Sequence, residues 1–263
     1  MIAFAKAHAY GNDFLYVEDA QVTGADLGAL ARAMCDRHQG VGADGLIVYS
    51  RTARGAAMRL FNADGGRAEV SGNGVRGLAA WLLHRSAQAE SGVTIETEAG
   101  AKEVVRLERA GSRETFRTEM GLPAGLRQTR IEAAGETVEA VVLNFGNPQC
   151  ILLGPLPDED RFRRLGQSLE RHPMFPDRTN VEFAFVERPD LVRILIWERG
   201  VGPTSSSGTG SCAALVAAAA FGGASRDATV IAPGGSQRVE WRDAGVYLTG
   251  WAEVLCEGKW LLD

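Results

Sequence analysis

The sequence predicts an α/β (α+β) protein made of two pseudosymmetric halves, each a mixed strand barrel around a central apolar helix. Three observations support this. Ser-Gly-Asn-Gly at 71–74 and Ser-Gly-Thr-Gly at 207–210 each open an apolar run, 136 residues apart. Alternating strand patterns dominate the rest of the chain. Two amphipathic helices lie at corresponding places in the two halves.

The duplication extends beyond the glycine-rich segments. The same offset, within two residues, aligns three further pairs: 11–12 with 146–147, 36–38 with 170–172, and 61–62 with 197–198. Four anchors in one register imply a repeated unit. The expected halves are 1–121 and 122–263, with the boundary in the Gly- and Pro-containing segment 121–130. Such a duplication can bring two equivalent helix starts to one cleft.

The individual elements follow from periodicity. Apolar residues one or two turns apart predict amphipathic helices near 24–37 and 158–171. Period-two alternation predicts strands at 56–63, 93–99, 103–109, 114–120, 181–187, 192–198, 228–233 and 246–254. The sheet is therefore expected to be antiparallel or mixed.

The runs at 75–84 and 211–221 are apolar nearly all round, which is typical of a helix enclosed by its own curved sheet. The start of such a helix has free N–H groups and a partial positive charge, so a carboxylate is the expected ligand. The glycine spacing at 72–77 and at 208–213 also fits a dinucleotide fingerprint. The polar segment before it and the missing alternating helices argue against that alternative.

Composition excludes several classes of function. A net charge of −5 and the lack of a basic cluster argue against nucleic-acid binding. No apolar stretch approaches a membrane span, and the first residues lack the apolar core of a signal peptide, so a cytoplasmic protein is expected. The four cysteines and four histidines are scattered, which predicts neither disulfides nor a metal site.

Six ordered blocks between residues 9 and 213 resemble the signature segments of the diaminopimelate epimerase family: AYGNDFLYVED, DRHQGVGADGL, FNADGGRAEVSGNGVR, NFGNPQC, FPDRTNVEFA and WERGVGPTSSSGTGSCA. The resemblance implies two α/β halves, a cofactor-free active site between them, a homodimer in the cytoplasm, and a role in making lysine and peptidoglycan precursors. The family interconverts LL- and meso-diaminopimelate by removing an α-proton from one face and returning one to the other.

The resemblance assigns the two catalytic positions to Ser71 and Ser207, where the family has cysteines. Inversion without a cofactor needs a base on one face of the α-carbon and an acid on the other, and a thiol at a helix N-terminus can supply a thiolate. A serine hydroxyl is less acidic, and a loss of ~5 pKa units would slow proton abstraction roughly 10⁵-fold. Gln149 replaces the family's His, and Cys212 matches an accessory cysteine that is expected to be packed.

By the same resemblance, the substrate is a small amino acid held by both halves. Asparagines would hydrogen-bond its amino and carboxylate groups, a Glu-Arg pair would hold the distal charged end, and the helix starts would hold the reacting end. The residues are Asn12, Asn62, Gly72, Asn73, Asn147, Asn180, Glu198, Arg199, Gly208 and Thr209. Gly45 stands where some members place a ligand-contacting Gln.

The two serines leave three functions open. The first is an epimerase or racemase that transfers protons by the two-base mechanism. The second is an isomerase or hydro-lyase of the same fold that acts on another small acid. The third is a catalytically silent amino-acid binder, whether natural or made by replacing both cysteines.

Overall fold

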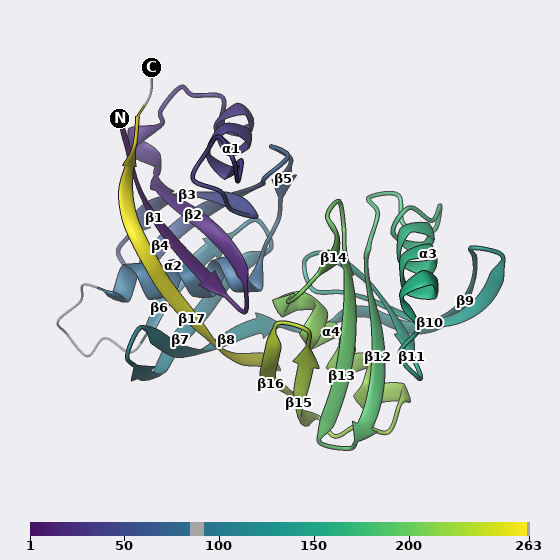
Figure 1. Cartoon of the computed structure of the whole chain (residues 1–263). Coiled ribbons are helices and arrows are strands. Elements are labelled where there is room, and N and C mark those ends of the chain that lie inside the picture. Colours follow the sequence, from purple (N-terminus) through teal and green to yellow (C-terminus); the bar gives the residue numbers. More distant parts are fainter. Residues whose placement is uncertain (85–91, 262–263) are drawn as a thin grey trace. The chain divides into compact units, whose positions relative to one another are not determined.

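The computed structural model describes residues 1–84 and 92–261, which form two compact units (Figure 1). The first unit contains Met1–Thr118 and the chain from Gly250 onward, and the second is Glu119–Thr249. The sequence predicted one half from 122 to 263, whereas the structure places the chain from Gly250 onward in the first unit. The reason is β17 (Gly245–Trp260), whose later part pairs antiparallel with β1 (Ile2–Ala9) of the first unit.

The first unit is an eight-stranded closed barrel. Each strand pairs with the next in the order given, and β17 pairs with both β8 and β1. The pairs β2–β3 and β4–β6 are parallel, and the short β5 (Arg67–Ala68) pairs with β4. The barrel strands are β1, β2 (Asn12–Glu18), β3 (Gly45–Thr52), β4 (Gly55–Asn62), β6 (Gly92–Thr97), β7 (Gly100–Ala110), β8 (Arg113–Gly121) and β17.

The helix α2 (Gly72–His84) runs through this barrel, against β1, β2, β6 and β7 (Figure 1). Every residue from Gly72 to Ala80 is buried, because strands surround the helix on all sides. Small side chains make this possible. Gly77 lies so close to Tyr16 that a Cβ at position 77 would be 2.1 Å from the Tyr16 hydroxyl oxygen.

The helix α1 (Leu27–Cys35) covers the outside of β3 and β4. Its N-cap, Asp26, accepts a hydrogen bond from Ala29 N at 3.0 Å. Its buried face of Leu30, Ala31 and Met34 packs in a second hydrophobic cluster with side chains from β2 and β3. The barrel strands β2 and β3 are therefore covered on both faces. A 3₁₀ turn at Asp19–Gln21 precedes the helix.

The second unit also arranges a mixed set of strands around a buried helix, and the two units confirm the predicted fold class. Its strands pair in succession around α4 (Gly208–Phe221), which contacts six of them, and β11–β12 and β13–β15 are parallel. The short β14 (Gly202–Thr204) pairs with β13. The strands are β9 (Ala124–Ala133), β10 (Glu136–Asn144), β11 (Pro148–Leu153), β12 (Asn180–Arg188), β13 (Leu191–Glu198), β15 (Asp227–Ala232), β16 (Gly235–Arg242) and the start of β17.

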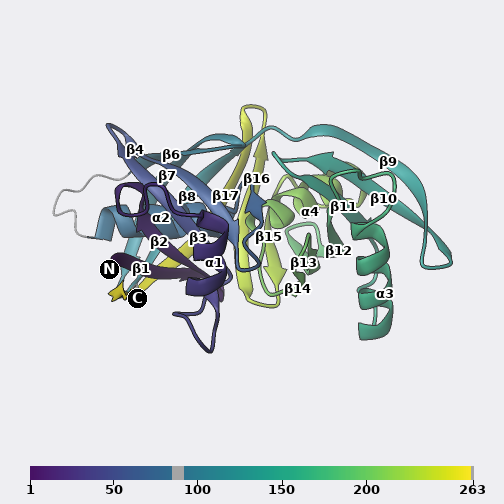
Figure 2. The ribbon, with the colours of Figure 1, turned by 90° about the horizontal axis from the view of Figure 1, so that it is seen from above.

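Two hydrophobic clusters lie on opposite faces of the second sheet. The helix α3 (Glu159–Glu170) packs on the outer face (Figure 2). There, Val181 and Phe183 of β12 meet Phe162. Ala184 points the other way, into the cluster around α4. Because side chains alternate along a strand, Glu182 shares the α4 face with Ala184.

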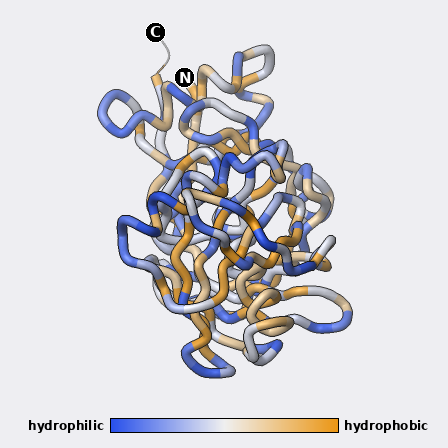
Figure 3. Tube along the Cα trace, turned by 90° about the vertical axis from the view of Figure 1, so that its right-hand side faces the viewer, coloured by the Kyte–Doolittle hydropathy of each residue, from blue (hydrophilic) through white to orange (hydrophobic). Residues whose placement is uncertain are grey.

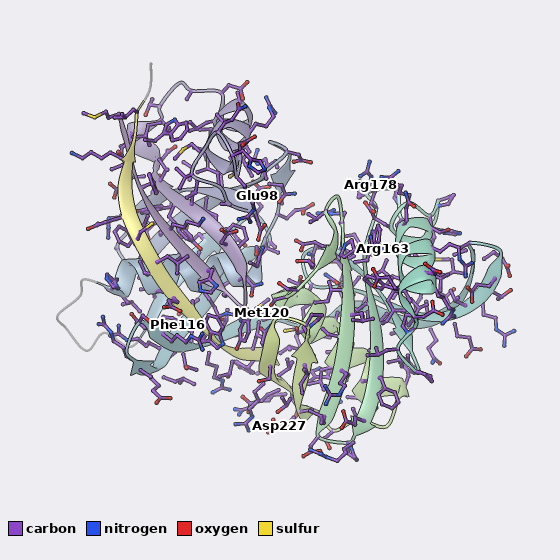
Figure 4. All side chains as sticks on the ribbon, in the orientation of Figure 1. Glu98, Phe116, Met120, Arg163, Arg178 and Asp227 are labelled. Atoms are coloured by element: carbon purple, nitrogen blue, oxygen red, sulfur yellow. The ribbon has the colours of Figure 1, made fainter. Side chains whose placement is uncertain are left out.

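The strand β8 contributes to both cores. Phe116 is fully buried in the first cluster and Met120 in the second (Figure 4). Hydrophilic residues are concentrated in the peripheral loops of the chain (Figure 3). In the described part of the chain, no helix is long and apolar enough to cross a membrane.

Candidate active site

The first half-site, defined as Ser71 with the polar residues around the start of α2, lies within the first unit. Ser71 is half-buried. Its Oγ accepts a hydrogen bond from Gly74 N at 3.1 Å, and its carbonyl accepts from Val75 N at 2.9 Å. The serine therefore caps the helix, a role for which serine is a preferred residue. The hydroxyl proton is not used by the cap and can be donated to a ligand.

A buried hydrogen-bonded chain lies beside Ser71. Asn73 Nδ2 donates to Asn12 Oδ1 at 3.2 Å, and Asn12 Nδ2 donates to Asp44 Oδ2 at 2.8 Å. Arg76, which is fully buried, donates from Nη2 to Asn73 Oδ1 and lies 5.7 Å from the centre of the Tyr10 ring. The structure thus brings the predicted residues Asn12, Gly72 and Asn73 together with Ser71, and adds a buried positive charge.

Asn62 is the last residue of β4, and its backbone pairs with Gly65 and Gly66 in the turn that follows. Its side chain is half-exposed and makes no hydrogen bond to the described residues, so it is available to a ligand. Gly45 pairs directly with Asn62. A Cβ at position 45 would lie 2.8 Å from the Phe61 carbonyl, so a glutamine could not be placed there without movement.

The second half-site, defined as Ser207 with the polar residues around the start of α4, lies within the second unit. Ser207 is the N-cap of α4, and its Oγ accepts from Gly210 N at 3.0 Å. Its carbonyl accepts from Ser211 N at 3.0 Å. Thr209 Oγ1 lies 3.5 Å from Ser207 Oγ. This cap repeats the geometry of Ser71 at the start of α2.

Asn147 joins Thr209 to the interior. Its Nδ2 donates to Thr209 Oγ1 at 3.3 Å, and its Oδ1 accepts from Gln149 Nε2 at 2.8 Å. Gln149 is fully buried. The predicted residues Asn147, Gly208 and Thr209 therefore lie beside Ser207, with Gln149 behind them.

Asn180 begins β12 and shapes the loop after β13. Its Oδ1 accepts from Arg199 N at 3.0 Å, and its Nδ2 donates to the Pro148 carbonyl at 3.1 Å. Arg199 donates from Nη1 to the Asp177 carbonyl at 3.2 Å. Asn180 is thus used largely by backbone groups, while Glu198 and Arg199 are half-buried at the strand end.

Glu182 is a buried carboxyl that the sequence analysis did not single out. It has no exposed surface, and burial raises its pKa well above the usual value, with a further contribution from the negative charge of Glu198. A Cβ at position 210 would lie 2.4 Å from Glu182 Oε1 and 3.0 Å from Ser207 Oγ. Glycine at 210 therefore leaves room for the carboxyl at the helix start.

Two features of the sequence could have identified Glu182 and Arg76, which the sequence-based prediction did not include. Glu182 is an acidic residue at an inward position of the alternating segment 181–187, and Arg76 is the one charged residue in 75–83. Cys212 is fully buried, in agreement with the expectation that it is packed. Across residues 1–84 and 92–261, no three His, Cys, Asp or Glu side chains gather as metal ligands would.

A cavity of about 470 Å³ in the first unit lies away from Ser71. It is lined by Tyr16, Tyr49 and Trp81, and Trp81 belongs to the last turn of α2. The helix starts are better candidates for the chemistry, because a hydroxyl proton and a partial positive charge coincide there. Each half-site can donate a proton and can stabilise a carboxylate or an oxyanion.

Comparisons with known proteins agree with this geometry. The chain is 42% identical to diaminopimelate epimerase of Desulforudis audaxviator over 98% of this chain and 99% of that protein. It is 36% identical to diaminopimelate epimerase of Desulfitobacterium hafniense, over 98% of both.

Solved structures show the same fold. A predicted epimerase from Pseudomonas aeruginosa matches over the full length of both chains, with a TM-score of 0.79 and 16% identity. A hydroxyproline epimerase from Agrobacterium vitis, solved with trans-4-hydroxy-L-proline, matches over 98% of this chain and 91% of that one, with a TM-score of 0.69 and 18% identity. The profile of the diaminopimelate epimerase family matches residues 4–123 and 141–255. The chain therefore belongs to the diaminopimelate epimerase family.

Proposed function

We propose that this protein epimerises diaminopimelate without a cofactor, with Ser71 and Ser207 as the two groups that exchange the α-proton. The observation that carries the proposal is the equivalence of the half-sites. In each, a half-buried serine caps a buried glycine-rich helix start, beside a hydrogen-bonded asparagine. The family relatives support diaminopimelate as the substrate.

The reaction divides naturally between two such groups. One serine, as its alkoxide, takes the α-proton from one face of the carbon and becomes a hydroxyl, and the other serine returns its hydroxyl proton to the opposite face and becomes the alkoxide. The negative charge that develops on the substrate carboxylate is met by helix N–H groups, which need no rearrangement. The proposal requires both half-sites to face one α-carbon in the ligand-bound protein.

The remaining predicted residues would bind the rest of the substrate. Asn12, Asn73 and Asn147 hold their amides at the helix starts, and Asn62 has a free side chain at its strand end. Glu198 and Arg199 offer both signs of charge, which suits the distal ammonium and carboxylate of diaminopimelate. We also propose that the protein is a homodimer in the cytoplasm, as the family resemblance implies. Light scattering of the purified protein tests the dimer.

The serine hydroxyls set the rate. Because a hydroxyl is a weaker acid than a thiol, turnover by the native sequence should be slow, and replacing both serines by cysteine should accelerate it. The measurement is exchange of the α-hydrogen of diaminopimelate into D₂O, followed by proton NMR. The Ser71→Cys, Ser207→Cys double variant should exchange at least 100-fold faster than the native sequence, and each single variant should gain less.

A matched control places the thiol nearby but not at a helix cap. Ser205→Cys adds a thiol two residues from Ser207, on a half-buried residue that precedes the helix, and should leave the exchange rate unchanged. A folded double variant that binds diaminopimelate by calorimetry but does not exchange it would refute the two-base assignment. A double variant that neither binds nor exchanges it would mean that the protein acts on another small acid.

A further inference from the structure

The two half-sites differ in what lies behind the helix start. In the second half-site, Glu182 Oε1 lies 2.4 Å from the position of a Cβ on Gly210. In the first half-site, the equivalent glycine is Gly74, and a Cβ there would lie 2.7 Å from Ile47 Cδ1. Ile47 and Glu182 are the third residues of β3 and β12. A methyl group in one half therefore corresponds to a carboxyl group in the other.

A chain of polar contacts connects the Glu182 carboxyl to Ser207. The terminal amide of Gln149 lies 3.1 and 3.2 Å from the two Glu182 oxygens and 2.8 Å from Asn147 Oδ1. Asn147 Nδ2 lies 3.3 Å from Thr209 Oγ1, which is 3.5 Å from Ser207 Oγ. Each member can both donate and accept, provided that Glu182 carries a proton.

The groups that face Glu182 decide its protonation. Glu198 at the end of β13 adds negative charge. Burial and the Glu182 charge both raise the pKa of the Cys150 thiol on β11, which therefore stays neutral and adds no charge. The N-terminus of α4 favours the ionised form, but a helix end stabilises a charge far less than complete burial penalises it. Burial therefore holds the pKa of Glu182 above its usual range.

We propose that Glu182 is a positioning residue for Ser207 and that its proton sets the direction of the hydrogen-bonded chain. When Glu182 is protonated, it donates to Gln149 Oε1, Gln149 Nε2 donates to Asn147 Oδ1, and Asn147 Nδ2 donates to Thr209 Oγ1. The Thr209 hydroxyl proton is then directed to Ser207 Oγ. This donor favours negative charge on the serine oxygen, which lowers the cost of proton release.

Ionisation of Glu182 reverses the chain. Gln149 Nε2 must then donate to the carboxylate, at 3.1 and 3.2 Å, and Gln149 Oε1 faces Asn147. The Asn147 amide turns in response, so that its Oδ1 faces Thr209 and accepts the hydroxyl proton of that residue. Ser207 Oγ then loses this side-chain donor and keeps the N–H of Gly210. In the first half-site, Ile47, which cannot ionise, takes the place of Glu182. The consequence for proton transfer rests on the proposed function, but the reversal itself does not.

NMR of the isotope-labelled protein tests the reversal without substrate. The side-chain amide signals of Gln149 and Asn147 should shift together as the Glu182 carboxyl carbon titrates, above the usual range for glutamate. Glu182→Gln, which keeps the shape and cannot ionise, should hold both amides at their low-pH positions across the titration. The matched control is Glu240→Gln, which removes another buried carboxyl of the same unit, on β16, and should leave the Gln149 and Asn147 titration intact.

Kinetics then separate this inference from the proposed function. In the Ser71→Cys, Ser207→Cys background, exchange by the thiol at position 207 should fall at least 5-fold as pH rises through the Glu182 titration, and Glu182→Gln should abolish that fall. Coupled amide shifts with no exchange at any pH would uphold the chain reversal and refute the epimerase proposal. A Glu182 carboxyl that titrates in the usual range, or an Asn147 amide that does not respond to it, would overturn the inference in the native sequence itself.

Discussion

Gly77→Ala probes how tightly α2 is enclosed by its barrel. A Cβ at position 77 would lie 2.1 Å from the Tyr16 hydroxyl oxygen and 3.0 Å from Tyr16 Cζ. Tyr16 is only 1% exposed, and its hydroxyl donates to the Gly74 carbonyl at 3.1 Å. The methyl group can therefore be admitted only if the tyrosine ring moves and this hydrogen bond is lengthened or lost.

Three terms of similar size decide the outcome. Alanine in place of glycine favours the helix by about 1 kcal/mol. Overpacking a closed core costs about 1–3 kcal/mol. Losing the Tyr16 hydrogen bond costs about 1 kcal/mol more. The unfavourable terms exceed the favourable one, so Gly77→Ala should lower the free energy of unfolding by roughly 1–3 kcal/mol.

A double-mutant cycle identifies the cause. Tyr16→Phe removes the nearest atom and leaves Cζ, at 3.0 Å, as the closest contact. Gly77→Ala should therefore cost at least about 1 kcal/mol less in the Tyr16→Phe background than in the native one. Urea unfolding followed by circular dichroism measures all four proteins. Additive effects, or a Gly77→Ala variant as stable as the native protein, would show that the barrel yields freely and would refute this reasoning.

Three further outcomes are expected. Asp13→Asn should destabilise the protein by about 1–3 kcal/mol at pH 7. Burial raises the pKa of Asp13, but Arg37 and Lys6 outweigh it and hold the pKa below the usual value, so the loss should shrink as pH falls toward 3 in urea unfolding. Removing either helix N-cap, by Asp26→Ala or Asp158→Ala, should cost about 1 kcal/mol by thermal unfolding, and no loss at Asp26 would contradict its cap. The free energy of unfolding of the native protein, compared with that of Glu182→Gln, should be greatest below the usual glutamate pKa. This difference should fall as pH rises toward the raised pKa of Glu182, because the folded state then retains a proton that the unfolded chain has released. Unfolding at pH 4 and pH 8 measures this difference, and parallel profiles would contradict it.

Alternation predicted strands such as β8 and β15, in which buried side chains alternate with more exposed ones along the chain. It failed for β2, where Leu15 and Val17 pack toward α1 while Phe14 and Tyr16 pack toward α2. A strand covered on both faces shows no period of two. Whether an outer helix covers a strand cannot be predicted from the sequence of that strand alone.

The segment 121–130 shows the opposite case. Its Gly, Pro and polar residues predicted a boundary, and the two compact units do change nearby, between Thr118 and Glu119, but the segment also contains the start of β9 at Ala124. Most side chains of β9 are exposed, so apolar alternation never develops. The repeated spacing identified the segments that contain the serines and asparagines of the helix starts, and the family resemblance predicted their roles. The roles of Glu182 and Arg76 were not predicted, because the significance of a buried charge depends on its neighbours from other strands.

The half-sites share their backbone and differ in their buried charges. The fifth residue of α2 is Arg76, a buried cation that holds Asn73, whereas the fifth residue of α4 is the uncharged Cys212. At the third residue of β3 and β12, the first half-site has the uncharged Ile47 and the second has Glu182, which can ionise. Both serines are held by the same cap hydrogen bond, so the cap alone cannot make one a better acid than the other. The first half-site permanently favours a negative charge, while the second can change its preference with one proton. In the proposed mechanism, the repeated backbone therefore fixes where protons are exchanged, and the side chains behind each helix start determine how readily each serine gives up its own.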